Sequence, residues 1–183
     1  MLSVFLTQEF ERRRQIPEQP ENNAVVLYYF VDSREDKKND ATAVLRGLIY
    51  LLLRERQELM DYLLPEFEAQ KDGLFGLKSI EALWRIFESM VLDASTGPVY
   101  CVIDGLDECT EDSLLHLLKK IKNFYIQQPQ IFIDIHDPRN EVPGSQAPMA
   151  PGLRPNTSAL KMVLVSREEP RFITEELADF PRI

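Results

Sequence analysis

The sequence has few cysteines, no excess of positive charge and no long apolar run, and each shortage excludes a class of protein. Two cysteines, Cys101 and Cys109, cannot build a disulfide framework or a four-ligand zinc site, and they fit a reducing, cytoplasmic compartment. With 21 basic and 30 acidic residues the formal net charge is -9, so we expect no nucleic-acid partner. The longest apolar run, Leu48–Leu53, is far shorter than the ~18 residues that cross a membrane, so we expect no membrane partner.

The 183 residues suit one domain in which strand-like and helix-like stretches alternate. Continuous apolar runs at Val25–Val31, Val99–Ile103 and Lys161–Val165 predict strands that are covered on both faces. Strands alternating with helices are typical of a three-layer α/β domain with a parallel sheet. Helices are expected where Leu2, Phe5, Leu6 and Phe10 recur at helical spacing, and over Thr42–Leu53, Gln57–Gln70 (with Leu59, Leu63, Leu64 and Phe67 facing inward), Ile80–Val91, from Thr110 onward and Pro170–Ala178.

A proline-rich stretch separates the last two predicted strands. Gln127–Ser158 holds half of the chain's 12 prolines, and proline removes the backbone donors that a sheet requires. We therefore expect residues 129–158 to form a flexible insertion within the domain. The early part, Ile131–Ile135, could instead pair as a short edge strand.

Three carboxylates follow the second predicted strand, in the segment Asp104-Gly-Leu-Asp-Glu108. Ligands of parallel α/β sheets bind beyond the carboxyl ends of the strands. Asp104, the last residue of the strand, could face a phosphate-bound Mg²⁺ directly or through water. Either Asp107 or Glu108 could hold and polarise a water that attacks a γ-phosphate. The alternative is that Asp107 and Glu108 form a solvated turn before a helix.

A polar residue and a guanidinium close the third predicted strand, at Ser166 and Arg167. Ser166 could hydrogen-bond the attacking water or a phosphate, and Arg167 could contact the γ-phosphate, since its planar fork matches phosphate oxygens. The alternative is that Arg167 pairs with Glu168 or Glu169.

The segment Asp104–Glu108 after a hydrophobic strand resembles the extended Walker B motif of NACHT NTPases, and Val165–Pro170 resembles their sensor 1. The stretch Val25–Leu53 is similar to the nephrocystin-like N-terminal domains of filamentous fungi. This resemblance implies a P-loop NTPase-like α/β/α fold and a switch that binds Mg²⁺ with ATP or GTP and gates the oligomerisation of a larger receptor. Such receptors are linked to fungal nonself recognition and cell death. By the same resemblance, Asp104 binds Mg²⁺, Asp107 and Glu108 position the catalytic water, and Ser166 and Arg167 lie at the sensor.

The sequence departs from this pattern because it contains no phosphate loop of the form G-x-x-x-x-G-K-[ST], and none of its 7 glycines is followed by lysine. Met1–Leu6 resembles the helix that follows such a loop, and the sequence stops at Pro181–Ile183, about where a last sheet strand would begin. We therefore expect residues 1–183 to form a partial NACHT domain that lacks the phosphate-loop strand and the terminal strand.

Three hypotheses of function remain open at this point. The chain is a piece of a NACHT signalling NTPase that does not hydrolyse nucleotide alone, or it is a non-catalytic interaction module. Such a module would associate with full-length NACHT relatives through an exposed sheet edge, or with itself. The third hypothesis is an unrelated metal-dependent hydrolase built on Asp104, Asp107 and Glu108. It lacks convincing further ligands, because His116 falls in a leucine-rich helix and His136 in the proline-rich stretch.

Overall fold

The computed structural model describes residues 2–15, 23–34, 39–75, 79–127, 160–167, 171–178 and 180. The expected insertion of residues 129–158, with its alternative edge strand Ile131–Ile135, lies outside these residues.

The three predicted strands form one parallel sheet. β1 (Val25–Phe30), β2 (Val99–Asp104) and β3 (Leu160–Val165) lie in the order β1-β2-β3, so that β2 is central. Each strand begins and ends close to its predicted bounds, because each coincides with an uninterrupted apolar run. The expected α/β class and the shared parallel sheet are confirmed.

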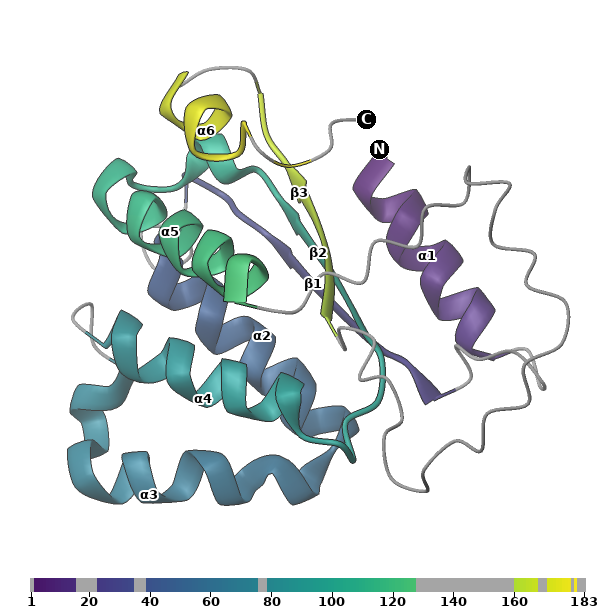
Figure 1. Ribbon diagram of the computed structural model, residues 1–183, viewed down its shortest axis with the longest axis vertical. Coiled ribbons are helices and arrows are strands. Elements are labelled where there is room, and N and C mark those ends of the chain that lie inside the picture. The colour runs from purple at the N-terminus through teal and green to yellow at the C-terminus, as the bar shows by residue number, and fades with distance from the viewer. Residues whose placement is uncertain are drawn as a thin grey trace, which may run out of the picture.

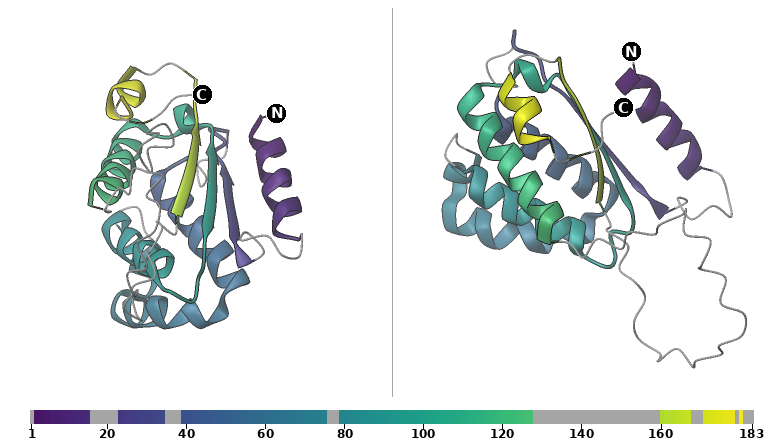
Figure 2. Two further views of the ribbon diagram at one scale, coloured as in Figure 1. Left: turned by 45° about the vertical axis from the view of Figure 1, so that its right-hand side comes forward. Right: turned by 45° about the horizontal axis from the view of Figure 1, so that its top comes forward.

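Helices lie on both faces of the sheet (Figures 1 and 2). α1 (Leu2–Arg14) covers one face, and α2 (Ala41–Glu55), α4 (Ile80–Leu92) and α5 (Glu111–Gln127) lie on the other. α3 (Met60–Gln70) packs on the outer side of α4, and the short α6 (Arg171–Glu176) packs against α5. No helix among the described residues is long and apolar enough to cross a membrane.

The main core fills the space between the sheet and the α2, α4 and α5 layer. α2 begins where the side chain of Asp40 accepts a hydrogen bond of 2.7 Å from the backbone N–H of Ala43, which satisfies a free donor of the first turn. Its apolar stripe then packs against the sheet and α4. The largest fully buried side chains of this core include Leu27, Leu45, Leu48, Leu52, Leu83, Phe87, Met90, Ile103 and Leu114.

The apolar stripe predicted for α1 packs on the sheet only in part. Phe5 is 61% exposed, whereas Ser3, which precedes it in the same turn, is buried. Phe10, seven residues after Ser3 and therefore on the same side of the helix, stacks on Tyr100 of β2 with ring centroids 4.9 Å apart. The prediction is therefore confirmed for Phe10 and wrong for Phe5, because a hydroxyl that finds a partner under the helix can be buried in place of an aromatic ring.

The inward face predicted for Gln57–Gln70 is also only partly correct. Leu59, in the 3₁₀ turn η2 (Gln57–Leu59), is buried, and Leu63 packs partly against the core. Leu64 and Phe67 are exposed, so the prediction that they face inward is wrong.

Candidate functional site

The carboxyl ends of all three strands are level. Phe30 is the register partner of Asp104, and Asp104 is the partner of Val165, so the last residues of β1, β2 and β3 lie side by side. The segments that follow them therefore emerge at one edge of the sheet, which we call the carboxyl edge. All five residues that the sequence nominates, Asp104, Asp107, Glu108, Ser166 and Arg167, lie at or just beyond it.

Gly105 makes the turn that redirects the chain after β2. Its φ of 79° is in the left-handed region, where a side chain is strained, and a Cβ here would lie 3.1 Å from the carbonyl oxygen of Val31. The Gly105 N–H donates to the carbonyl of Val165 over 3.0 Å, and the Val31 N–H donates to the carbonyl of Asp104 over 2.9 Å. The turn thus ties the ends of the three strands together and leads into the 3₁₀ turn η4 (Leu106–Glu108), which carries Asp107 and Glu108.

A side chain of α1, the helix that covers the sheet face opposite α2, α4 and α5 (Figure 1), holds Asp104 in place. The hydroxyl of Ser3 in α1 donates to Oδ2 of Asp104 over 2.5 Å, and Ser3 is only 2% exposed. Among the described residues, Ser3 supplies the side-chain hydrogen bond to this carboxylate. The carboxylate is half-buried at the edge, and the hydroxyl of Ser3 holds its Oδ2.

Asp107 is bound by both the backbone and the side chain of Arg167. The Arg167 N–H donates to Oδ1 over 3.0 Å, and the guanidinium Nε donates to Oδ2 over 2.5 Å. The Asp107 side chain is 7% exposed and that of Arg167 is 77% exposed. Burial alone would raise the pKa of Asp107, but the two bonds from Arg167 outweigh it and hold the pKa below its ordinary value.

Glu108 points to the third element of the edge, the segment after β1. The backbone N–H and the hydroxyl of Ser33 both donate to Oε2 of Glu108, over 2.9 and 3.0 Å. The guanidinium of Arg167 lies 3.8 Å from Oε1. Glu108 therefore keeps one oxygen toward Arg167 and solvent, whereas Asp107 is enclosed.

The hydroxyl of Ser166 contacts neighbouring protein groups. Its hydroxyl donates to the carbonyl of Arg167 over 2.9 Å and lies 3.4 Å from Oδ1 of Asp107. The sequence alternative in which Arg167 pairs with Glu168 or Glu169 concerns residues outside those described. Within the described residues Arg167 pairs with Asp107 and Glu108, so these two carboxylates are not a merely solvated turn.

The acidic residues do not form a preassembled metal cage. Among the described residues there is no group of three or more His, Cys, Asp and Glu side chains placed to hold a metal ion. A single carboxylate nevertheless fits Mg²⁺, which takes one or two protein carboxylates and completes its shell with waters and phosphate oxygens. Asp104 fits this role best, because Asp107 and Glu108 already neutralise Arg167.

Two site residues were missed by the sequence reasoning, Ser3 and Ser33. Ser33 lies just beyond the end of β1, and the rule that places ligands at strand ends could have nominated it as it nominated Ser166. Ser3 could have been noticed only through its helical spacing from Phe10, which is too weak a signal to identify a contact with a residue 101 positions away.

Fold and site together define a parallel α/β domain with an acidic strand end facing an arginine. The sequence profile of the family described as "Nephrocystin 3, N-terminal" matches residues 1–133, which include Asp104, Asp107 and Glu108. The chain belongs to this family, the nephrocystin-like N-terminal domains.

A curated relative adds one further comparison. The chain is 34% identical over 99 residues to the "Vegetative incompatibility protein HET-E-1" of Podospora anserina, a match that covers 52% of this chain. The match spans 7% of the length of that relative. No solved structure matches the chain.

Proposed function

We propose that this chain is a piece of a NACHT-family signalling NTPase, with a P-loop NTPase-like fold whose Walker B and sensor residues meet at the carboxyl edge. The single observation that carries the proposal is the pairing of Arg167 with Asp107 next to Asp104. It joins the two segments that resemble Walker B and sensor 1, which are 60 residues apart in the sequence. The match to HET-E-1, a fungal incompatibility protein, supports a role in fungal NOD-like signalling.

In this proposal each residue of the edge has a separate role toward Mg²⁺ and ATP or GTP. Asp104 would hold the metal, whose charge would offset the negative charge of the phosphates. Glu108 would position a water, a role supported by Ser33, which holds one of its oxygens while Arg167 lies near the other. Asp107 acts through Arg167, which it holds at the edge.

Arg167 can reach a phosphate without dismantling the edge. Its guanidinium is exposed, so it can turn away from Asp107, while its backbone N–H continues to hold Oδ1 of that carboxylate. The anionic γ-phosphate would then replace Asp107 as the partner of the guanidinium, in the planar two-pronged geometry that arginine favours.

The sequence supplies no glycine-rich loop ending in Lys-Ser or Lys-Thr, whose backbone N–H groups cradle phosphates. Loss of one preorganised donor of developing charge costs several kcal/mol of transition-state stabilisation, roughly 10²–10³ in rate. We therefore propose that the 183-residue chain hydrolyses nucleotide little or not at all on its own.

The test compares the chain with a version extended at its amino terminus by a strand and a G-x-x-x-x-G-K-[ST] loop. We expect Mg²⁺-dependent hydrolysis only in the extended version, and its loss on Asp104→Ala. Asp61→Ala, which removes an exposed carboxylate from the distant α3, is the matched control and should leave the rate unchanged. Turnover in the extended version that survives Asp104→Ala would contradict the metal-binding role, and robust turnover by the 183-residue chain would contradict the proposed inactivity.

A second candidate function is a non-catalytic module that adds a strand from a partner protein to the sheet. β3 favours it, because β3 is the outer strand of the described sheet and most of its apolar side chains, Met162 to Val165, are half-exposed. Protection of the β3 amides from hydrogen exchange on mixing with a longer relative, in the absence of nucleotide, would support this function over the first. The two free cysteines support a cytoplasmic location for either function.

A further inference from the structure

A small hollow lies between α1 and the end of the sheet at which the strands begin. It is lined by Phe10 and Arg13 of α1, by Ala24 and by Tyr100 of β2, and its volume is about 30 Å³. A cavity needs roughly 10–15 Å³ to hold one water molecule, so this hollow has room for about two waters or one small tetrahedral group. It is separate from the carboxyl edge, because Tyr100 precedes Asp104 by four residues of extended strand, roughly 13 Å.

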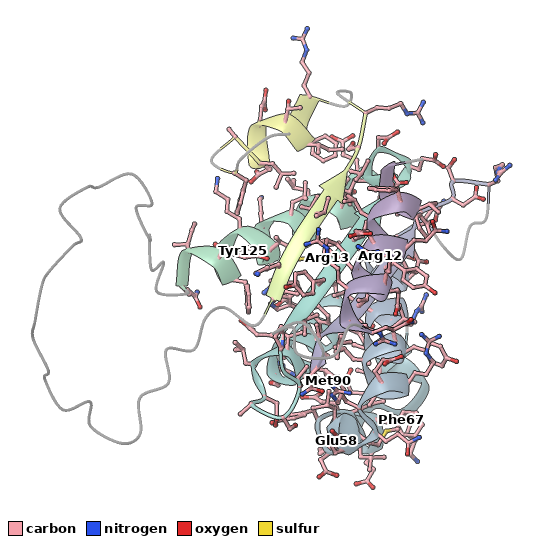
Figure 3. The ribbon with its side chains drawn as sticks, turned by 90° about the vertical axis from the view of Figure 1, so that its right-hand side faces the viewer. Arg12, Arg13, Glu58, Phe67, Met90 and Tyr125 are labelled. Carbon is pink, nitrogen blue, oxygen red and sulfur yellow. The ribbon has the colours of Figure 1, made fainter. Side chains whose placement is uncertain are left out.

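Two cations from different elements lie beside the aromatic ring of Tyr100. Arg13, in the last turn of α1, lines the hollow, and Nζ of Lys161 in β3 lies 5.1 Å from the centre of the Tyr100 ring. Lys161 is also the register partner of Tyr100, so the two residues are neighbours in the sheet. Figure 3 looks onto this face of the molecule and shows Arg13 on the side of α1 toward β3. Two positive charges therefore lie at one small space.

Both cations can bind a further anion. The guanidinium of Arg13 is 55% exposed and donates from Nε to Oε1 of Glu9 over 2.9 Å. Within the part of the chain that the structure describes, its terminal nitrogens form no hydrogen bond, and no carboxylate pairs with Lys161. Glu9 does not depend on Arg13, because Arg12 donates to both oxygens of Glu9, over 2.9 and 2.7 Å. Arg13 can therefore turn to a ligand without leaving that carboxylate unpaired.

The positive charge here is local. The whole chain has a formal net charge of -9, so an anion is drawn to this place by the groups around the hollow and not by the chain as a whole. A third guanidinium strengthens the local field. Arg56 donates to the carbonyl and the side chain of Asn23, over 3.0 and 2.6 Å, and Asn23 directly precedes Ala24 of the hollow.

We propose that this hollow binds a dianionic phosphate group, as inorganic phosphate or as the end of a small phosphomonoester. The planar fork of Arg13 takes two phosphate oxygens, and Lys161 adds a point charge. Two cations match the double charge of a phosphate, whereas a carboxylate carries only one charge. The space holds the phosphate group alone, and whatever is esterified to it stays outside the hollow. The site does not depend on the proposed function.

Bound phosphate ties together two elements that flank β2, α1 through Arg13 and β3 through Lys161. A ligand that binds only the folded chain stabilises it in proportion to the logarithm of the ligand concentration. Phosphate should therefore raise the urea midpoint of the chain. The stabilised helix is the one whose other end carries Ser3, the partner of Asp104.

The experiment is a ¹H–¹⁵N NMR titration of the full chain with inorganic phosphate, without Mg²⁺. The ionic strength is held at about 0.15 M so that screening stays constant. The amide signals of Tyr100, Lys161 and the last turn of α1 should shift and saturate, while those of Asp104 and Arg167 stay in place. Phenyl phosphate, titrated in parallel, distinguishes the two sources. Tighter binding than that of inorganic phosphate identifies a phosphomonoester, and equal or weaker binding identifies inorganic phosphate.

Three variants test the site. Arg13→Gln/Lys161→Gln should weaken binding by ~10-fold or more, because it removes both charge-assisted contacts. Arg85→Gln/Lys119→Gln removes two exposed cations from α4 and α5, changes the net charge equally and should bind as the unchanged chain does. Ala24→Val leaves every charge in place and should also weaken binding, because the larger side chain fills the hollow. Circular dichroism of each variant establishes that it is folded.

Four results overturn the proposal. The first is the absence of any saturable shift, and the second is a shift confined to Asp104 and Arg167, which would place phosphate at the carboxyl edge. The third is a folded Arg13→Gln/Lys161→Gln or Ala24→Val variant that binds as the unchanged chain does. The fourth is an equal loss in the control variant, which would show a general attraction to positive charge.

Discussion

Asp107 and Arg167 are bonded to each other, but replacing Asp107 should lower the free energy of unfolding more than replacing Arg167. Arg167→Ala removes the exposed guanidinium but leaves the backbone N–H on Oδ1, so it should lower the free energy of unfolding by only about 0.5–1 kcal/mol. Asp107→Ala removes the acceptor of both bonds and should cost about 2 kcal/mol, because hydrogen bonds to charged groups contribute roughly 1.5–3 kcal/mol. The carboxylate, not the guanidinium, is therefore the more important member of the pair for stability.

The assay is urea unfolding followed by far-ultraviolet circular dichroism, for both single variants and the double variant. The double variant should cost less than the two singles together, since the bond between the side chains can be lost only once. Lys119→Ala, an exposed residue of α5, is the control and should change stability by no more than about 0.5 kcal/mol.

The effect of acid follows from the lowered pKa of Asp107, which is held by the bonds from Arg167 against the opposing effect of burial. The carboxylate contributes its stabilisation above the unfolded-state pKa of about 3.9 and loses it as the pH falls through the lower folded-state value. The difference in the free energy of unfolding between the unchanged chain and Asp107→Ala should therefore be largest at pH 7 and decrease in acid. Equal costs for the two single variants, or a gap that widens in acid, would refute this account of the edge.

Three further predictions concern the surroundings of the site. Ser3→Ala should lower the urea midpoint by the equivalent of about 1 kcal/mol of unfolding free energy. Asp104→Asn should then lower the free energy of unfolding less in the Ser3→Ala background than in the unchanged chain, because the bond between the two side chains is already gone. Strictly additive effects of the two substitutions would contradict this bond. Gly105→Ala should destabilise by about 1–2 kcal/mol, because alanine is strained at a φ of 79°, and an unchanged urea midpoint would count against the turn geometry. The pKa of Cys109 is raised to about 12, first by burial and then by the carboxylates of Asp40, Asp107 and Glu108. Alkylation of Cys109 in the folded chain at pH 8 should therefore be ~10³-fold slower than that of an ordinary thiol. Fast labelling of Cys109, detected by mass spectrometry, would contradict this environment.

The strands, and the meeting of the segments that follow β2 and β3, could be predicted because both depend on patterns that the sequence displays directly. Uninterrupted apolar runs mark buried parallel strands, and parallel strands bring their carboxyl ends to one edge. The sequence pattern could not decide which partners Asp107 and Glu108 contact, because the backbone geometry of the turn determines the direction of each side chain. The structure separates them, with Asp107 enclosed by Arg167 and Glu108 held by Ser33.

The errors lie in α1 and α3, and they share a cause. Helical spacing identifies which side chains share a face, but it does not say which face the rest of the chain covers. In α1 the hydroxyl of Ser3 reaches Asp104, so the face with Ser3 is buried and Phe5 is left outside. In α3, which contacts α4, η2 and η3, Leu64 and Phe67 stay exposed although they are as apolar as the buried Leu59.

The bonds that build the carboxyl edge join positions far apart in the chain, and this governs when the edge can form during synthesis. Ser3 and Asp104 are 101 residues apart, Ser33 and Glu108 are 75 apart, and Asp107 and Arg167 are 60 apart. Chains dominated by such distant contacts fold slowly, since loop closure must precede the interactions that reward it. On the ribosome, α1 and β1 therefore emerge long before β2 can pair with them, and their apolar surfaces must wait uncovered, which makes the nascent chain a candidate for chaperone binding until Arg167 has been translated.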